Sequence, residues 1–352
     1  MAIDFDAYRY FPSLRSRQWE MRGYAELLPE EKDRVAPMVV MATHGRLKSV
    51  AEVSARIEQY TEGRSHIIDL ELSPIYACDE CTALADPTDG FEAWRTFVEG
   101  RPNVVPTALL PSNAPARDMV RQVILLEQSK GQVVLRSRSP SSDLPTLLSI
   151  LSAVDSINNL LVVLDFGYVR SRLKACLAEA ASVINSLREV DDTLRIVVLG
   201  SSYPKSVAAY SDEGMALEIE ERTLHSSLGG DAVAIYGDYA SIHPEPFEPM
   251  QSRFVPRIDL ALPDAWIFRR VRSDQGGFAR CAQLIVDLTD WDPRFAELNW
   301  GAGKIAAAAT GDLTQMNAPA PWIAARVNMH LWQQINYAAG SSSAEDYDDV
   351  FG

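Results

Sequence analysis

Short apolar runs recur along the chain, and a segment with helical periodicity follows most of them. The clearest run is Leu160–Tyr168 (LLVVLDFGY), in which five apolar residues lead to Asp165, a glycine and an aromatic residue. A continuous apolar run of this length, bounded by turn residues, is typical of a strand buried on both faces, as in a parallel sheet. We expect further strands of this kind at residues 35–41, 66–71, 103–110, 131–138, 194–204, 232–239 and 265–269.

Helical patterns separate these strands. Ser49 caps a helix over residues 50–60, with Glu52 at the third helical position as in a capping box. Similar patterns cover residues 117–129, 140–156, 171–188 and 218–227, and a last helix covers 322–337. The opening segment, from Tyr8, is predicted to begin in an extended conformation and to continue as a helix through Leu28.

Strand–helix alternation repeated about eight times admits a closed (βα)8 barrel or an open doubly wound sheet. An open sheet normally carries a glycine fingerprint after its first strand, whereas Met41–Arg46 (MATHGR) contains a single glycine. The pattern therefore favours the α/β class with a TIM-barrel-like single domain over residues 1–339, including a C-terminal helical segment. Residues 340–352 are expected to form a short flexible acidic tail.

Composition narrows the class of protein. A hydrophobic fraction of 47% and a charged fraction of 23% in 352 residues are typical of a globular protein. No apolar run approaches the about 20 residues of a membrane span, the start does not resemble a signal peptide, and four cysteines are too few for a disulfide framework. A cytoplasmic location is the expectation. The net charge of −15 argues against a surface for duplex nucleic acid.

Charged residues follow several of the expected strands. In a barrel the carboxyl ends of the strands form one rim, and active sites lie there. We therefore take Asp165, Asp238 and His243 as candidate catalytic groups. Arg136, Arg138 and Arg269 are candidates for binding substrate or phosphate, and Asp69 and Glu71 for holding a divalent metal, the only cofactor that the sequence suggests.

A structural interpretation of the same residues stays open, because Asp–Arg pairs can close the end of a barrel without catalysing a reaction. His44, after the first expected strand, is a further candidate base, although a single loop histidine is more often only exposed. Cys78 and Cys81 have the spacing of a metal or redox pair, but a zinc site needs a second pair.

The C-terminal segment has a different character. Gly340–Ala344 (GSSSA) is typical of a flexible linker, and residues 345–352 (EDYDDVFG) place aromatic residues among acids. Such a segment is either a solvated terminus or a docking peptide, in which Tyr347 or Phe351 fills a pocket on a protein partner.

Several motifs in order resemble the phage beta-protein family. They are Tyr10–Glu20 (YFPSLRSRQWE), Pro37, Gly200–Pro204 (GSSYP), Tyr236–Pro244 (YGDYASIHP) and Trp322–His330 (WIAARVNMH), and the resemblance covers residues 8–337. It implies a barrel-like α/β fold and a setting in phages or in mobile or defence regions of bacterial genomes, without implying a reaction. The insertion between Cys78 and Asp89 and the acidic tail depart from the family pattern.

Two functions follow from these observations. The first is an accessory or recognition protein of phage or anti-phage systems that acts through a protein partner. The second is a metal-dependent hydrolase, resembling a phosphodiesterase or nuclease, with its site at the rim of the barrel. The sequence leaves open whether the protein is an enzyme at all, and it does not set the oligomeric state.

Overall fold

The computed structural model describes residues 3–43, 47, 49–73, 75, 79–210, 215–246 and 254–337. The chain groups into two compact units. The barrel unit consists of residues 1–17, 34–203 and 220–248, and the second unit of residues 18–33, 204–219 and 249–352. The single domain expected for residues 1–339 stays a prediction.

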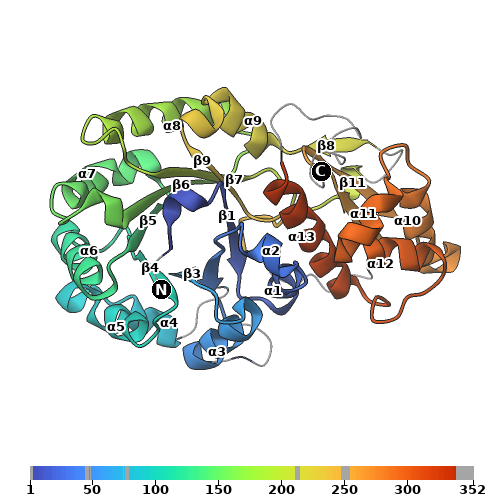
Figure 1. The fold of residues 1–352 in the computed structure, drawn as a ribbon, viewed down its shortest axis with the longest axis horizontal. Coiled ribbons are helices and arrows are strands. Elements are labelled where there is room, and N and C mark those ends of the chain that lie inside the picture. Colours follow the sequence, from blue (N-terminus) through green and yellow to red (C-terminus); the bar gives the residue numbers. More distant parts are fainter. Residues whose placement is uncertain are drawn as a thin grey trace. The chain divides into compact units, whose positions relative to one another are not determined.

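Parallel strands close a barrel in the first unit, which confirms the expected fold class (Figure 1). In the described residues eight strands take part, in the order β1-β2-β3-β4-β5-β6-β7-β9, and each pairs with its neighbours in parallel. Their bounds are β1 Tyr10–Arg15, β2 Met38–Met41, β3 His66–Leu70, β4 Val104–Ala108, β5 Val133–Ser137, β6 Leu160–Tyr168, β7 Ile196–Ser201 and β9 Ile235–Asp238.

Helices of the barrel unit lie outside the strands (Figure 1). They are α3 Val50–Thr61, α4 Asp79–Leu84, α5 Thr88–Glu99, α6 Ala116–Lys130, α7 Pro140–Leu151, α8 Leu173–Arg188 and α9 Glu220–Ser227. The capping box expected at the start of α3 is confirmed, since the Ser49 side chain accepts from the Glu52 amide and the Glu52 side chain accepts from the Ser49 amide.

The identity of one barrel strand differs from the expectation. Residues 265–269 were expected to supply the eighth strand, but β11 (Ala265–Arg270) pairs antiparallel with its neighbours in a separate sheet. The place in the barrel belongs to β1, where Tyr10 pairs with Tyr236 of β9 and Ser13 pairs with Met38 of β2. All six residues of β1 are buried, and it pairs with a strand on each side although it contains a proline.

An apolar core fills the barrel. It is built mainly from alternate residues of the strands, whose side chains point to the inside because side chains alternate along a strand, and Ile3, Phe5 and Ala36 add to it from the segments before β1 and β2. Its members are Ile3, Phe5, Phe11, Ala36, Met38, Ile67, Val105, Val134, Leu161, Val163, Val197 and Leu199. Because side chains alternate along a strand, a residue two positions after a core residue of the same strand also points inward.

The second unit contains a small antiparallel sheet in the order β10-β11-β8. Its strands are β8 Ala216–Glu218, β10 Arg257–Ala261 and β11. Its helices are α1 Gln18–Ala25, α2 Pro29–Lys32, α10 Gly277–Val286, α11 Pro293–Leu298, α12 Trp300–Ala309 and α13 Pro319–Ile335.

Helix α13 is the centre of the second unit. From Ala324 to Gln334 every residue is buried, and Arg326 donates to Asp259 of β10 at 2.6 Å. Two glycines allow other helices to approach it closely. A Cβ at Gly23 of α1 would clash with Val327, and a Cβ at Gly301 of α12 would clash with the Ala325 carbonyl.

Candidate functional site

A layer of polar side chains lies at the carboxyl ends of the barrel strands. Each follows a core residue of the same strand by two positions, as Asp69 follows Ile67 and Arg136 follows Val134. These side chains therefore point into the barrel, above the apolar core. The members of this layer, called the inner polar layer below, are Asp69, Thr107, Arg136, Asp165 and Ser201.

Arg136 joins the two aspartates of this layer. Its Nε and Nη2 donate to Oδ2 of Asp165 at 3.0 and 2.8 Å, and its Nη1 donates to Oδ2 of Asp69 at 3.0 Å. Burial by itself would lower the pKa of Arg136, but Asp165, Tyr239 and Asp69 raise it above its usual value. The guanidinium is therefore permanently charged and held by carboxylates on two sides.

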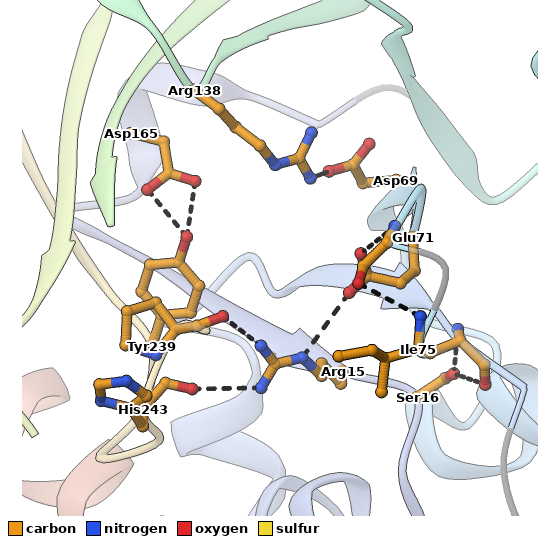
Figure 2. Close-up of polar contacts among 12 residues, drawn as sticks. Arg15, Ser16, Asp69, Glu71, Ile75, Arg138, Asp165, Tyr239 and His243 are labelled. Carbon is orange, nitrogen blue, oxygen red and sulfur yellow. Dashed lines mark hydrogen bonds and ion pairs between the residues drawn. The ribbon is translucent and has the colours of Figure 1, made fainter. Parts of the chain in front are cut away.

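Asp69 has partners at both of its oxygens. Oδ1 accepts from the Thr107 hydroxyl at 2.7 Å and from the Leu70 amide at 2.8 Å. Oδ2 accepts from Arg136 and, at 2.6 Å, from Nη2 of Arg138 (Figure 2). Burial alone would raise the pKa of Asp69, but the two arginines and the Thr107 hydrogen bond hold it below its usual value.

Tyr239 follows β9 and reaches across to Asp165 of β6. Its hydroxyl lies 2.6 Å from Oδ2 and 2.8 Å from Oδ1 of that carboxylate (Figure 2). It also accepts from Nη2 of Arg136 at 3.1 Å. The Gly167 amide completes the set by donating to Oδ1 of Asp165 at 2.9 Å. Burial and the nearby Asp165 raise the pKa of Tyr239, so the phenol keeps its proton.

Arg138 differs from the rest of the network in its exposure. Its side chain is 46% exposed, whereas those of Asp69 and Arg136 are each 2% exposed. It stands just past the end of β5, with one side of its guanidinium on Asp69. Arg138 is therefore the most exposed side chain of the network and the one that a ligand at the barrel mouth can reach most easily.

A second cluster fastens the segment after β9 to β1. Arg15 donates through Nη1 to the His243 carbonyl at 3.3 Å and through Nη2 to the Pro244 carbonyl, and its Nε lies 3.8 Å from Oε2 of Glu71 (Figure 2). Glu71 also accepts from the Ser73 amide at 2.9 Å. Glu71 is therefore engaged by a cation and a backbone amide.

His243 is buried in this second cluster. Its Nδ1 lies 2.9 Å from the Tyr203 carbonyl and therefore carries the hydrogen, because a carbonyl only accepts. Its Nε2 is buried and has no hydrogen-bond partner within the described part of the chain, while the exposed Glu245 carboxylate lies 3.7 Å away.

The Asp238 side chain points to the opposite face of its strand from the side chains of the inner polar layer. It is two residues after Tyr236, on the side of β9 that faces the helices, and accepts from the Tyr10 hydroxyl at 2.6 Å and the Tyr236 hydroxyl at 2.9 Å. Burial and the Asp238 charge raise the pKa of both phenols well above their usual value. The structure thus places Asp238 outside the barrel lumen, apart from Asp165.

Glu221 of α9 lies beside Asp238. One oxygen accepts from the Ser202 amide at 2.8 Å and from the Ser202 hydroxyl, and in the described residues the other has no hydrogen-bond partner. Burial and the Asp238 charge raise the pKa of Glu221 to about 8. Glu221 is therefore largely protonated at neutral pH.

The structure unites some of the expected site residues and separates others. Asp69, Arg136, Arg138 and Asp165 form one network. The expectation that Arg269 ends a barrel strand is wrong, because this residue belongs to β11 of the second unit and donates to the Phe268 carbonyl at 2.9 Å. His44, Cys78, Tyr347 and Phe351 lie outside the described residues.

The carboxylate oxygens of the inner polar layer are all engaged by groups of the protein. In the ranges that the structure describes, no three His, Cys, Asp or Glu side chains are arranged to hold a metal ion. Asp69 and Asp165 already accept hydrogen bonds at all of their oxygens. A divalent ion would have to displace Arg136, whose charge opposes it.

Sequence reasoning missed three groups that complete these clusters: Arg15, Thr107 and Glu221. Arg15 lies on the strand that was not recognised, and Glu221 on a helix. Thr107 follows the core residue Val105 by two positions, so the alternation along a correctly aligned β4 would have indicated it.

Comparison with known proteins gives a consistent result over the length of the chain. The family model described as beta protein matches residues 10–336. Protein beta of Enterobacteria phage P4 is 35% identical over 356 residues, covering 99% of each chain. A family 5 glycoside hydrolase from Prevotella bryantii is similar in structure with a TM-score of 0.38 and 9% identity, over 63% of this chain and 79% of that one. That likeness is too distant to bear on function.

Proposed function

The chain belongs to the beta protein family, which includes a phage protein, and from this premise we propose that it is a recognition protein that acts through a protein partner. In this proposal the barrel supplies a rigid frame, and binding, not turnover, is its task. A metal-dependent hydrolase is the competing function, and the same experiments address it.

The observation that supports this proposal is the saturation of the buried carboxylates. A general base needs a free lone pair and a metal ligand needs a free oxygen. Asp69 and Asp165 instead accept hydrogen bonds from Thr107, Tyr239 and the two arginines at every oxygen. Such a network holds the strand ends in fixed positions, which suits a binding surface.

The charge balance at the barrel mouth supports the same function. Arg136 and Arg138 neutralise Asp69 and Asp165, and Arg15 faces Glu71. A site for phosphate would need an excess of cations in the place where the ligand binds. The half-exposed Arg138 can still exchange part of its contact with Asp69 for a polar group of a partner.

The C-terminal segment is the second element of the proposal. We expect Tyr347 and Phe351 to contact the partner, with the acids around them steering the segment toward a basic groove. The barrel and the C-terminal segment would then contribute separately to the affinity for the protein partner.

The test uses the full chain, tagged and co-expressed with the products of the genes that flank its own. We expect one of these products to co-purify, and Tyr347→Ala with Phe351→Ala to reduce its yield by about tenfold, as the loss of two aromatic contacts would. Ser341→Ala with Ser342→Ala is the matched control in the linker. Equal yields with all variants would remove the segment from the proposal.

Thermal melting separates the two functions. For a recognition protein, millimolar Mg²⁺ or Mn²⁺ with nucleotides or oligonucleotides should leave the Tm unchanged. Asp165→Asn is measured alongside. A rise in Tm with metal that is lost in Asp165→Asn would favour the hydrolase and reject the proposal.

A further inference from the structure

An exposed aromatic ring of the second unit rests on a buried aromatic base. Phe254 is 54% exposed, and its ring stacks on Phe278 with centroids 6.4 Å apart. Phe278 in turn stacks on Trp322 of α13 at 5.7 Å, and both of these rings are buried. The outer ring therefore rests on a buried aromatic base while much of its surface faces solvent.

Two exposed arginines lie in the segments next to this ring. The Val271 amide donates to the Pro256 carbonyl at 3.1 Å, which sets Arg272 beside the start of β10, and the Gly277 amide donates to the Arg272 carbonyl at 3.1 Å. Arg280 lies in the first turn of α10, where its amide donates to the Gly276 carbonyl at 3.3 Å and a Cβ at Gly276 would come within 2.8 Å of its Cβ, so it lies over the turn that joins Arg272 to the helix. Phe254, Arg272 and Arg280 are called the aromatic–arginine patch below, and Asp274 is the exposed acid between them.

We propose that residues 345–352 of the same chain dock on the aromatic–arginine patch, with Phe351 against Phe254 and the acidic side chains beside Arg272 and Arg280. The chemistry of the two sides is complementary. The segment contains Glu345, Asp346, Asp348 and Asp349, and no lysine or arginine follows Arg326. The patch is locally cationic in a chain whose net charge is −15.

The chain is long enough for this contact within one molecule. Helix α13 rises about 20 Å between Trp322 and its last residue, Ile335. The two ring-to-ring steps from Trp322 to Phe254 are 5.7 and 6.4 Å. An extended segment of the length of residues 338–351 spans up to about 46 Å. Its glycine and serines at 340–343 leave it free to turn back along the helix.

This docking deepens the proposed function, and it rests on that function in taking residues 345–352 as the partner-binding element. The patch would hold Tyr347 and Phe351 in the absence of a partner. A partner that binds these two side chains would then have to compete with the patch for them. Because surface ion pairs are screened by salt, the contact should weaken as ionic strength rises.

Amide hydrogen exchange of the full-length protein, read by mass spectrometry on peptides from residues 345–352, tests the docking. We expect these amides to exchange about tenfold more slowly in the wild type than in Phe254→Ser or in Arg272→Glu with Arg280→Glu. About 0.5 M NaCl should remove most of the protection. Arg272→Lys with Arg280→Lys should retain it, because the charge is kept.

Two matched controls change equivalent exposed groups elsewhere. Met215→Ser removes an apolar side chain that is 61% exposed, and Arg117→Glu reverses an arginine that is 87% exposed. Neither should alter exchange in residues 345–352. All of these positions are exposed, so the variants should fold, and their thermal melts check this.

Three outcomes would overturn the docking. Exchange of residues 345–352 at the rate of an unstructured peptide in the wild type would show that the segment is free. Equal protection in the patch variants would place it elsewhere. Protection that grows with protein concentration would make a second copy the occupant. No partner is present in this experiment, so each failure would leave the proposed function standing.

Discussion

Arg136 and Asp165 are joined by two hydrogen bonds that end on the same oxygen, Oδ2, from Nε at 3.0 Å and from Nη2 at 2.8 Å. The other side of the guanidinium is occupied by Asp69, at 3.0 Å from Nη1. Arg136 therefore ties β5 to β3 on one side and to β6 on the other, in the middle of the barrel mouth.

Replacing Arg136 by methionine should destabilise the protein strongly. Asp69 and Asp165 would stay buried without their shared cation, and breaking a buried pair in this way typically lowers the free energy of unfolding by about 3–5 kcal/mol. Urea denaturation measures the change. Arg138→Gln is the matched control and should lower stability by about 1 kcal/mol or less, since this side chain is 46% exposed. Equal losses for the two variants would contradict the central role of Arg136.

Tyr239→Phe should lower the free energy of unfolding by about 1.5–3 kcal/mol, because it removes a hydrogen bond to a charged group. The ring and its packing stay in place. A double-mutant cycle with Asp165→Asn measures the coupling between the two side chains. If the two effects simply add, the hydroxyl contributes nothing through Asp165.

The stability of the protein should depend on the protonation of Glu221. Its pKa is raised in the folded state from the usual 4.5 to about 8. The stabilisation from the neutral acid is therefore complete below about pH 4.5 and is lost as the pH rises toward 8, with a slope of about 1.4 kcal/mol per pH unit.

Glu221→Gln keeps a neutral group that can accept from Ser202 and should flatten this part of the pH profile of the free energy of unfolding. Denaturant titrations between pH 5 and 9 for both proteins give the comparison. Glu218→Gln is the control, at an exposed position of β8. A variant that keeps the wild-type slope would show that another group is responsible.

Phe11→Ala should lower the free energy of unfolding by about 3–5 kcal/mol, because Phe11 is fully buried in the barrel core on the strand that closes the barrel. Met215→Ala, at a residue that is 61% exposed, should change it by about 0.5 kcal/mol or less. Chemical denaturation followed by circular dichroism measures both. A small loss for Phe11→Ala would mean that β1 is dispensable for closure.

The alternation of strands and helices was predictable because parallel strands buried on both faces form long apolar runs. β1 escaped recognition for a local reason: its sequence, YFPSLR, contains a proline, a serine and an arginine, all of which it buries. Residues 265–270 (AWIFRR) do form a strand. No pattern within that segment distinguishes an antiparallel sheet from the barrel.

The candidate site was predictable in part, on the same physical grounds. Asp69, Arg136 and Asp165 follow apolar runs, and the ends of parallel strands meet at one rim. Asp238 follows such a run as well, but a shift of one residue along a strand reverses the face to which a side chain points. The exact register of β9 was needed to see that Asp238 faces the helices.

The pairing of Tyr10 with Tyr236 has a consequence for the order of events during synthesis. The first barrel strand emerges from the ribosome long before β9, and until then one edge of β1 has no strand to join. Closure of the barrel must therefore wait for most of the barrel unit to be made. A nascent chain that stops before residue 235 would expose two unpaired strand edges, which makes it a substrate for chaperones or for aggregation.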